Sequence, residues 1–218
     1  MTYQEIRQNE EVLAFLKKGD NNLGVLGYTE HAEAHCSMVA ERAAYILKTF
    51  GYSDHEIELA RIAGFMHDIG NAVNRSHHAE HGAVLANTIL RDTDMSVEDR
   101  VTVVSAIGNH DESTGGAKDA VSAALILADK SDVRRSRVRN VEDTKIDIHD
   151  RVNYSVIKSR LKINEEHTLI KLKLSVDTRY GSVMDYFEIF LGRMIMCRKA
   201  AEKLGLDFKL IINEQQLI

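Results

Sequence analysis

Apolar side chains recur at helical spacing along the first two thirds of this 218-residue chain. Short polar connections rich in glycine, asparagine and aspartate separate these segments, and the chain contains no proline to interrupt a helix. The expected helices cover 4–18, 29–50, 53–67, 78–90, 96–110 and a stretch from 121 to the arginine-rich turn at 134–139. Six helices joined by short connections predict a mainly α fold, with an all-α helical bundle over residues 1–148.

A different pattern begins after His149. Residues 170–176 alternate apolar and polar side chains, which is typical of a half-buried strand, and 152–163 is the expected antiparallel partner. Residues 183–204 return to helical spacing, and 207–212 indicate a last strand. We therefore expect a small α+β subdomain over residues 149–218, with about three antiparallel strands and one helix.

Composition limits the classes of function. A net charge of −5 and a pI near 6.1 argue against a dedicated nucleic-acid binder. No apolar run approaches the length of a membrane span and no signal-peptide pattern opens the chain, so we expect a cytoplasmic protein without a membrane partner. Cys36 and Cys197 have neither a metal-type spacing nor a disulfide pattern, and we expect buried free thiols.

An adjacent His67-Asp68 pair closes an apolar helical run just before Gly70. A neutral imidazole together with a carboxylate suits borderline divalent metals such as Mn, Fe, Co, Ni or Zn. The pair alone carries little weight in a chain with 10 histidines. Its meaning depends on whether further ligands occur at suitable positions on other helices.

Further candidate ligands do occur in order along the helical part. They are His35 near a helix start, the group His77, His78 and His81, His110 at a helix end, and Asp129 on an otherwise apolar helix. A carboxylate on an apolar helix is costly to bury unless it is paired or bound to metal. Pairing of Asp129 with the neighbourhood of Lys130 or with Arg134 is the structural alternative, and each histidine taken singly is structural or exposed on that interpretation.

This ordered set resembles the HD-domain superfamily of metal-dependent phosphohydrolases over roughly residues 25–135. The matching positions are His35 in Glu33–Val39, the doublet His67-Asp68, His78 before Gly82-Ala83, His110 in Ile107–Asp111, and Asp129 in Leu127–Lys130. The resemblance implies metal ligation by His35, His67, Asp68, His78, His110 and Asp129. It also implies one or two divalent ions per chain, with Asp68 bridging two and with Asp68 and His67 as the catalytic residues.

The sequence departs from the superfamily in two places. Many binuclear relatives carry a lysine where this chain has Asn71, so a phosphate-contacting cation is missing there or comes from elsewhere. The loop at 111–116 lacks the Gly-Tyr-Pro extension of the cyclic-dinucleotide phosphodiesterases, which argues against that subclass.

Cations after Asp129 and in the loop after the doublet are candidates for substrate phosphate binding. They are Lys130, Arg134, Arg135 and Arg75, and Asp132 is expected to support a metal ligand from behind. The alternative is a solvated helix end with cations at its negative pole. A second pair, His149-Asp150, lacks an apolar helical lead-in and a following glycine, and we interpret it as structural.

We therefore predict a metal-dependent phosphohydrolase acting on a small phosphorylated metabolite, with a nucleotide as the expected substrate, through metal-activated water. The sequence leaves two alternatives open. One is a binuclear iron oxygenase of the HD type, and the other is a metal-stabilised regulatory module without catalysis. Substrate, metal identity, a homodimer and the role of residues 149–218 lie beyond what the sequence decides.

Overall fold

The computed structural model describes residues 1–26, 28–139 and 148–217, with only the backbone described for 148–150. The helical part contains α1 (Tyr3–Arg7), α2 (Glu10–Val25), α3 (Glu33–Thr49), α4 (Asp54–Met66), the 3-10 turn η1 (Ile69–Ala72), α5 (His78–Arg91), α6 (Val97–Gly108), α7 (Ala120–Lys130) and the 3-10 turn η2 (Arg135–Arg137). The C-terminal part contains α8 (Ile148–Ser155), β1 (Val156–Ile163), β2 (Leu169–Val176), α9 (Val183–Lys203), β3 (Asp207–Ile212) and β4 (Gln215–Gln216).

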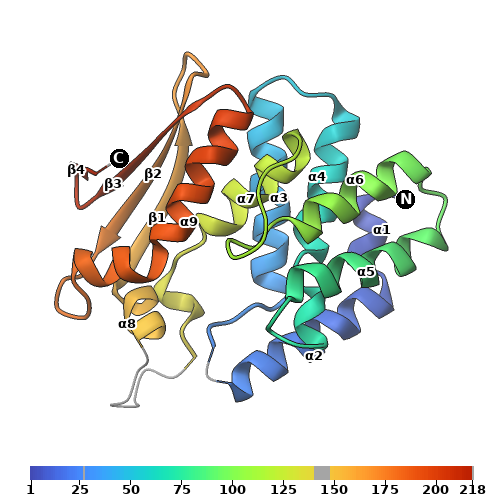
Figure 1. Ribbon diagram of the computed structural model, residues 1–218, viewed down its shortest axis with the longest axis horizontal. Coiled ribbons are helices and arrows are strands. Elements are labelled where there is room, and N and C mark those ends of the chain that lie inside the picture. Colours follow the sequence, from blue (N-terminus) through green and yellow to red (C-terminus); the bar gives the residue numbers. More distant parts are fainter. Residues whose placement is uncertain (27, 140–147, 218) are drawn as a thin grey trace.

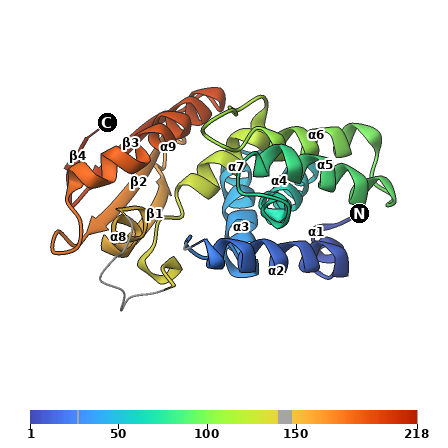
Figure 2. The ribbon, with the colours of Figure 1, turned by 60° about the horizontal axis from the view of Figure 1, so that its bottom comes forward.

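Helix α7 lies at the centre of the helical part, with α3, α4 and α6 packed around it (Figure 1). Its side chains from Val121 to Ala128 are all buried, as expected for a helix that is apolar on every side. Helix α9 packs against α7 and also covers one face of the C-terminal sheet (Figure 2). The buried apolar residues of the two parts form one continuous core.

The mainly α fold with a C-terminal sheet and helix is confirmed, but the predicted orientation of the last strand is wrong. Strands β1 and β2 are antiparallel, whereas β3 pairs with β2 in parallel and a short β4 follows it. Helix α9 carries the chain back along the sheet, so β3 begins at the same end as β2. The boundary at residues 148 and 149 adjoins the part of the chain outside the description and stays a prediction.

Several expected element boundaries differ from the structure. The segment 4–18 divides into α1 and α2 because the Asn9 side chain accepts hydrogen bonds from the N–H groups of Glu11 and Val12 and starts a new helix. Gly19 does not end α2; a Cβ there would lie 3.1 Å from the backbone nitrogen of Ala72, so glycine permits close packing on η1.

Helix α7 also ends earlier than expected, and strand β1 begins later than expected. Helix α7 ends at Lys130, so the arginines at 134–139 follow in irregular backbone and η2. Residues 152–155 belong to α8, where the sequence pattern had predicted a strand from 152. No helix within the described ranges is long and apolar enough to cross a membrane.

Candidate metal centre

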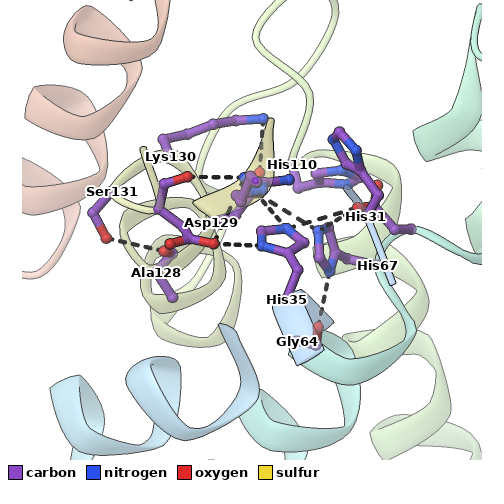
Figure 3. A network of polar contacts seen from close by, with 12 residues as sticks. His31, His35, Gly64, His67, His110, Ala128, Asp129, Lys130 and Ser131 are labelled. Carbon is purple, nitrogen blue, oxygen red and sulfur yellow. Dashed lines mark hydrogen bonds and ion pairs between the residues drawn. The ribbon is translucent and has the colours of Figure 1, made fainter. Parts of the chain in front are cut away.

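Side chains from five helices converge at one end of α7, and Figure 3 shows His35, His67, His110 and Asp129 among them. The set consists of His35 from α3, His67 and Asp68 at the end of α4, His78 at the start of α5, His110 just after α6, and Asp129 near the end of α7. The first five are at most 4% exposed, and the Asp129 side chain is 12% exposed. All six residues predicted as metal ligands therefore lie together in a nearly buried cluster.

The cluster contains two groups of potential ligand atoms that meet at Asp68. In the first group, His35 Nε2 lies 3.4 Å and His67 Nε2 3.7 Å from Asp129 Oδ1, and His67 Nε2 lies 3.2 Å from Asp68 Oδ2. In the second, His78 Nε2 lies 3.7 Å from Asp68 Oδ1 and 3.2 Å from His110 Nε2. The two oxygens of Asp68 thus face different groups.

Each of the four histidines has an oxygen atom behind the ring, which for His78 is the Arg75 carbonyl, 3.2 Å from Nδ1. The Nδ1 atom of His35 lies 2.8 Å from Asp132 Oδ2, that of His67 lies 2.8 Å from the carbonyl of Gly64, and that of His110 lies 2.6 Å from the carbonyl of Ile107. When Nδ1 carries the hydrogen and donates it, Nε2 is left as a lone-pair donor toward the cluster. The predicted supporting role of Asp132 agrees with this geometry.

Several buried polar atoms in the cluster have no hydrogen-bond partner among the described residues. They are His35 Nε2, His67 Nε2 and Asp68 Oδ2, and all three point toward the common centre. An unpaired buried polar atom costs free energy, and a bound cation would satisfy all three at once. The residues present therefore fit a divalent metal.

Two glycines around the doublet allow the helices to approach closely. A Cβ on Gly64 would lie 2.7 Å from the Cα of Ala40, and a Cβ on Gly70 would lie 1.9 Å from the carbonyl oxygen of His78. The first contact brings α4 against α3, and the second brings the start of α5 against η1. Side chains here would push His78 away from the doublet.

The electrostatic environment of the cluster favours neutral rings for His78 and His110 and an ionised carboxylate for Asp68. Burial lowers the pKa of His78, and burial together with His67 and His78 lowers that of His110 to about 3. Burial alone would raise the pKa of Asp68, but His67 and His31 hold it well below its usual value. Neutral imidazoles and ionised carboxylates are the forms that bind metal.

His67 is the exception in the metal-free cluster. Burial favours the neutral ring, but the Asp68 and Asp129 carboxylates raise the pKa of His67 well above its usual value. Metal binding there must displace a proton. The neighbouring Cys36 is fully buried, and burial raises the pKa of its thiol, so the neutral thiol is favoured.

Lys130 and Glu112 form an ion-pair network beside Asp129. The Nζ atom of Lys130 lies 2.8 Å from Asp129 Oδ2 and 2.8 Å from Glu112 Oε2, and Arg193 of α9 lies 2.8 Å from Glu112 Oε1. The network connects α9 to the end of α7. The ammonium group predicted to bind substrate is thus held between two carboxylates of the chain itself.

The structure places the three predicted arginines in different surroundings. Arg75 Nη1 lies 3.2 Å from His78 Nε2 and 3.4 Å from Asn71 Oδ1, at the edge of the cluster. Arg134 binds Asp132, with Nη2 3.1 Å from Oδ2.

Arg135 has turned toward the C-terminal part. Its guanidinium lies 4.4 Å from the Tyr154 ring centre, and its Nε donates to the Tyr154 carbonyl at 2.6 Å. Of the predicted phosphate-binding arginines, Arg75 is the one placed directly against a predicted ligand.

The structure also resolves an ambiguity among neighbouring histidines. His77 has a left-handed backbone with φ 60°, its side chain is 68% exposed, and it lies 3.6 Å from Glu80. His81 lies beside His77, with 6.5 Å between the ring centres. His78 is the member of this group that faces the cluster. The side chains of His149 and Asp150 lie outside the described part of the chain.

Two side chains near the cluster were absent from the sequence-based set. The His31 ring lies 5.6 Å from that of His35, and Asp111 Oδ2 lies 3.8 Å from His78 Nε2. Each is close in sequence to a predicted ligand, His31 to His35 and Asp111 to His110. That proximity was the only signal available before the fold was known.

A family model of the HD domain matches residues 33–155. The chain belongs to the HD-domain family. The match includes all six residues of the cluster. HD proteins form a superfamily of metal-dependent phosphohydrolases that bind divalent metals, and with the His/Asp cluster this makes the chain a metal-dependent hydrolase.

Two further proteins are similar to this HD-domain chain. The uncharacterized protein MJ1020 of Methanocaldococcus jannaschii is 28% identical over 190 residues, covering 76% of this chain and 73% of that protein. A crystal structure described as a predicted HD superfamily hydrolase, from an uncultured Thermotogales bacterium, has a TM-score of 0.45 and 23% identity, covering 62% of this chain and 75% of that one.

Proposed function

We propose that this HD domain hydrolyses a phosphomonoester, phosphodiester or phosphoanhydride of a small metabolite, with a nucleotide as the expected substrate. The observation that carries the proposal is the shared carboxylate, because Asp68 presents Oδ2 to one buried group and Oδ1 to the other. This arrangement supports two metals, one held by His35, His67, Asp68 and Asp129, and one by Asp68, His78 and His110.

Divalent ions bound there would lower the pKa of a bound water to about 7 and hold phosphate oxygens for attack. Two such ions with the Asp68 and Asp129 carboxylates leave a net charge of about +2, which favours an anionic substrate in a buried site. The choice of phosphate chemistry follows from this charge. No nucleophilic side chain is required of the protein.

The surrounding residues orient the ligands and the substrate. We assign Lys130 to the orientation of Asp129, because it binds Oδ2 and leaves Oδ1 toward His35 and His67. Asn71 donates to Asp68 Oδ1 at 2.8 Å, at the position where many binuclear HD proteins carry lysine. Arg75, beside His78, is then the cation that donates hydrogen bonds to a phosphate oxygen at the edge of the site.

The test is hydrolysis by purified protein loaded in turn with Mn, Fe, Co, Ni or Zn. Phosphate release from a panel of nucleotides and sugar phosphates is measured with and without oxygen, beside elemental analysis of the metal content. The proposal expects release that continues anaerobically. A reaction that stops without oxygen would indicate an oxygenase, and metal-replete protein that turns over no phosphate compound would indicate a regulatory module.

A further inference from the structure

A pocket of about 300 Å³ lies beside the metal centre, between the C-terminal end of α2 and the segment that follows the His-Asp doublet. Its walls include Leu23, Val25 and Leu26 from α2 and its end, and Val73 and Arg75 from the segment after η1. None of the six cluster residues lines it. The pocket is thus a separate cavity that adjoins the site.

Exposed apolar side chains gather at this pocket. Val25 is 89% exposed, Leu26 62% and Val73 56%, and Tyr28 beside them is 40% exposed. Large apolar side chains that cluster on a surface next to a reactive centre are typical of a ligand-contacting surface. The aliphatic side chains of Val25, Leu26 and Val73 would cover the faces of a flat ring.

Asparagine amides supply polar groups in the same pocket. The Nδ2 atom of Asn22 donates to the carbonyl of Ala72 at 3.1 Å, and Asn74 Oδ1 accepts from the backbone nitrogen of Ser76 at 2.9 Å. Within the described residues this leaves Asn22 Oδ1 as an acceptor and Asn74 Nδ2 as a donor without partners. A neutral ring with both a donor and an acceptor on its edge would match them, whereas an alkyl chain would leave both unpaired.

Arg75 connects the pocket to the metal centre. The same side chain lines the pocket, lies 3.2 Å from His78 Nε2, and places its guanidinium 5.8 Å from the centre of the Tyr28 ring. A substrate phosphate bound by Arg75 at the metal centre would therefore leave its organic group next to the pocket. Arg75 is the cation among the residues that line the pocket, and the other lining residues are neutral.

We propose that this pocket binds the nucleobase of the substrate, so that the enzyme acts on nucleotides in preference to the same phosphates without a base. This inference rests on the proposed phosphohydrolase function. The proposed function does not say which residues recognise the organic part of the substrate, and the base pocket supplies them. The walls formed by Leu26 and Val73 hold the ring, and the amides of Asn22 and Asn74 bind its edge.

The test compares substrates that share a phosphate group and differ in the base. AMP is paired with ribose 5-phosphate, and ATP with inorganic tripolyphosphate. We expect kcat/KM to be higher for the member of each pair that carries the base. The ratio of the two kcat/KM values, with base over without base, should fall roughly tenfold in the double variant Leu26→Ala/Val73→Ala. The rate on the partner without a base should not change. The matched control is Val97→Ala/Val101→Ala, which truncates exposed valines on α6 instead.

Unchanged metal content verifies that each variant is folded and loaded. A wild-type ratio near one, or a ratio that the Leu26→Ala/Val73→Ala variant leaves unchanged, overturns the base-binding proposal. A variant that changes the sedimentation coefficient but not the ratio also overturns it, because the patch would then be a contact between two copies of the chain.

If no phosphate compound is hydrolysed, the proposed function fails, and the pocket is then tested by binding alone. Saturation-transfer NMR with adenosine, guanosine, cytidine and uridine gives that readout without turnover. A signal that the Leu26→Ala/Val73→Ala variant loses and the control keeps supports the base pocket. Absence of a signal for all four nucleosides overturns it.

Discussion

The charged and histidine side chains of the metal centre converge in the interior of the helical part, whereas the basic side chains of the C-terminal sheet lie along its outer face. Around the metal centre, Asp68 and Asp132 are buried, and ligand pairs such as His78 and His110 face each other. On the sheet, the register places Lys162 opposite Lys171. The helical part thus gathers carboxylates and histidines in a buried site of low dielectric constant. The sheet gathers lysines on a surface in contact with water.

The basic face of the sheet is the side directed away from α9. It comprises Lys158, Arg160 and Lys162 of β1, Lys171 and Lys173 of β2, and Lys209 of β3. Water screens these charges, so their repulsion costs little and can protect an edge strand such as β1 from pairing with other chains.

Interior charges cannot be explained in that way. A buried carboxylate or imidazole is stable only when a partner compensates its lost hydration, and His35 Nε2, His67 Nε2 and Asp68 Oδ2 have no hydrogen-bond partner in the part of the chain that the structure describes. The buried charges of the cluster therefore require a bound ligand to be stable, whereas the charges on the sheet require only water. The following variants test this distinction, from the largest expected effect to the smallest.

Replacement of Asp68 should have the largest effect. Because Asp68 faces both groups of ligands, Asp68→Ala should reduce metal content to background and hydrolysis by at least about a thousandfold. Elemental analysis and initial rates measure the two effects. Asp68→Asn, which preserves side-chain volume, separates loss of charge from loss of packing. Full metal content in Asp68→Ala would contradict the site described above.

Replacement of Asp132 should weaken one metal position. Asp132→Asn removes the charge behind His35 and should lower metal affinity by roughly 10–100-fold. Competition with a fluorescent chelator measures the affinity. Asp177→Asn is the control, because Asp177 also pairs with arginines but lies away from the cluster. Equal effects of the two substitutions would show that Asp132 has no special part in metal binding.

Replacement of Glu112 should change stability and its dependence on pH. Burial raises the pKa of Glu112, but Lys130 and Arg193 lower it well below its usual value. The unfolded chain therefore takes up a proton first as the pH falls below about 4.3, and the stabilisation is lost from there downward.

Glu112→Gln should cost roughly 1–3 kcal/mol at pH 7, less than for a fully buried pair because the Glu112 side chain is 26% exposed. Urea unfolding between pH 3 and 7 should give a flatter profile for the variant than for the wild type. Parallel profiles for the two proteins would show that the ion pairs of Glu112 contribute no pH-dependent stability.

Replacement of one lysine on the sheet should have the smallest effect, with the opposite sign. Lys173→Thr removes the repulsion between Lys173 and Arg160 and should stabilise the protein by about 0.2–1 kcal/mol. The gain in urea midpoint should shrink as salt is added, which separates the charge effect from the strand preference of threonine. Lys118→Thr in a loop is the control. A gain that does not depend on salt would exclude repulsion as its cause.

Much of the site could be predicted from the sequence because its candidate ligands lie at helix ends and their order resembles that of the HD-domain superfamily. His35, His67, His110 and Asp129 each lie near the start or end of an apolar helical run, and such runs can be recognised locally. Packing of the apolar faces then brings the helix ends to one place. For the same reason the mainly α fold was predictable.

Other features depend on contacts between distant segments. The spacing of His77, His78 and His81 could not distinguish them, and His78 was chosen on the family resemblance; in the structure His78 is placed by the contact between Gly70 and the start of α5. The parallel pairing of β3 with β2 likewise depends on the path of α9, because an alternating apolar pattern has no direction.

The sequence by itself determined the helical runs, the ligand types and their order along the chain. Only the tertiary structure decided that Lys130 is held by Asp129 and Glu112, that Arg135 is directed to Tyr154, and that Arg75 lies between the metal centre and a pocket. Long flexible cations acquire a role from the partners within their reach. Those partners come from segments far away in sequence, so no local pattern encodes them.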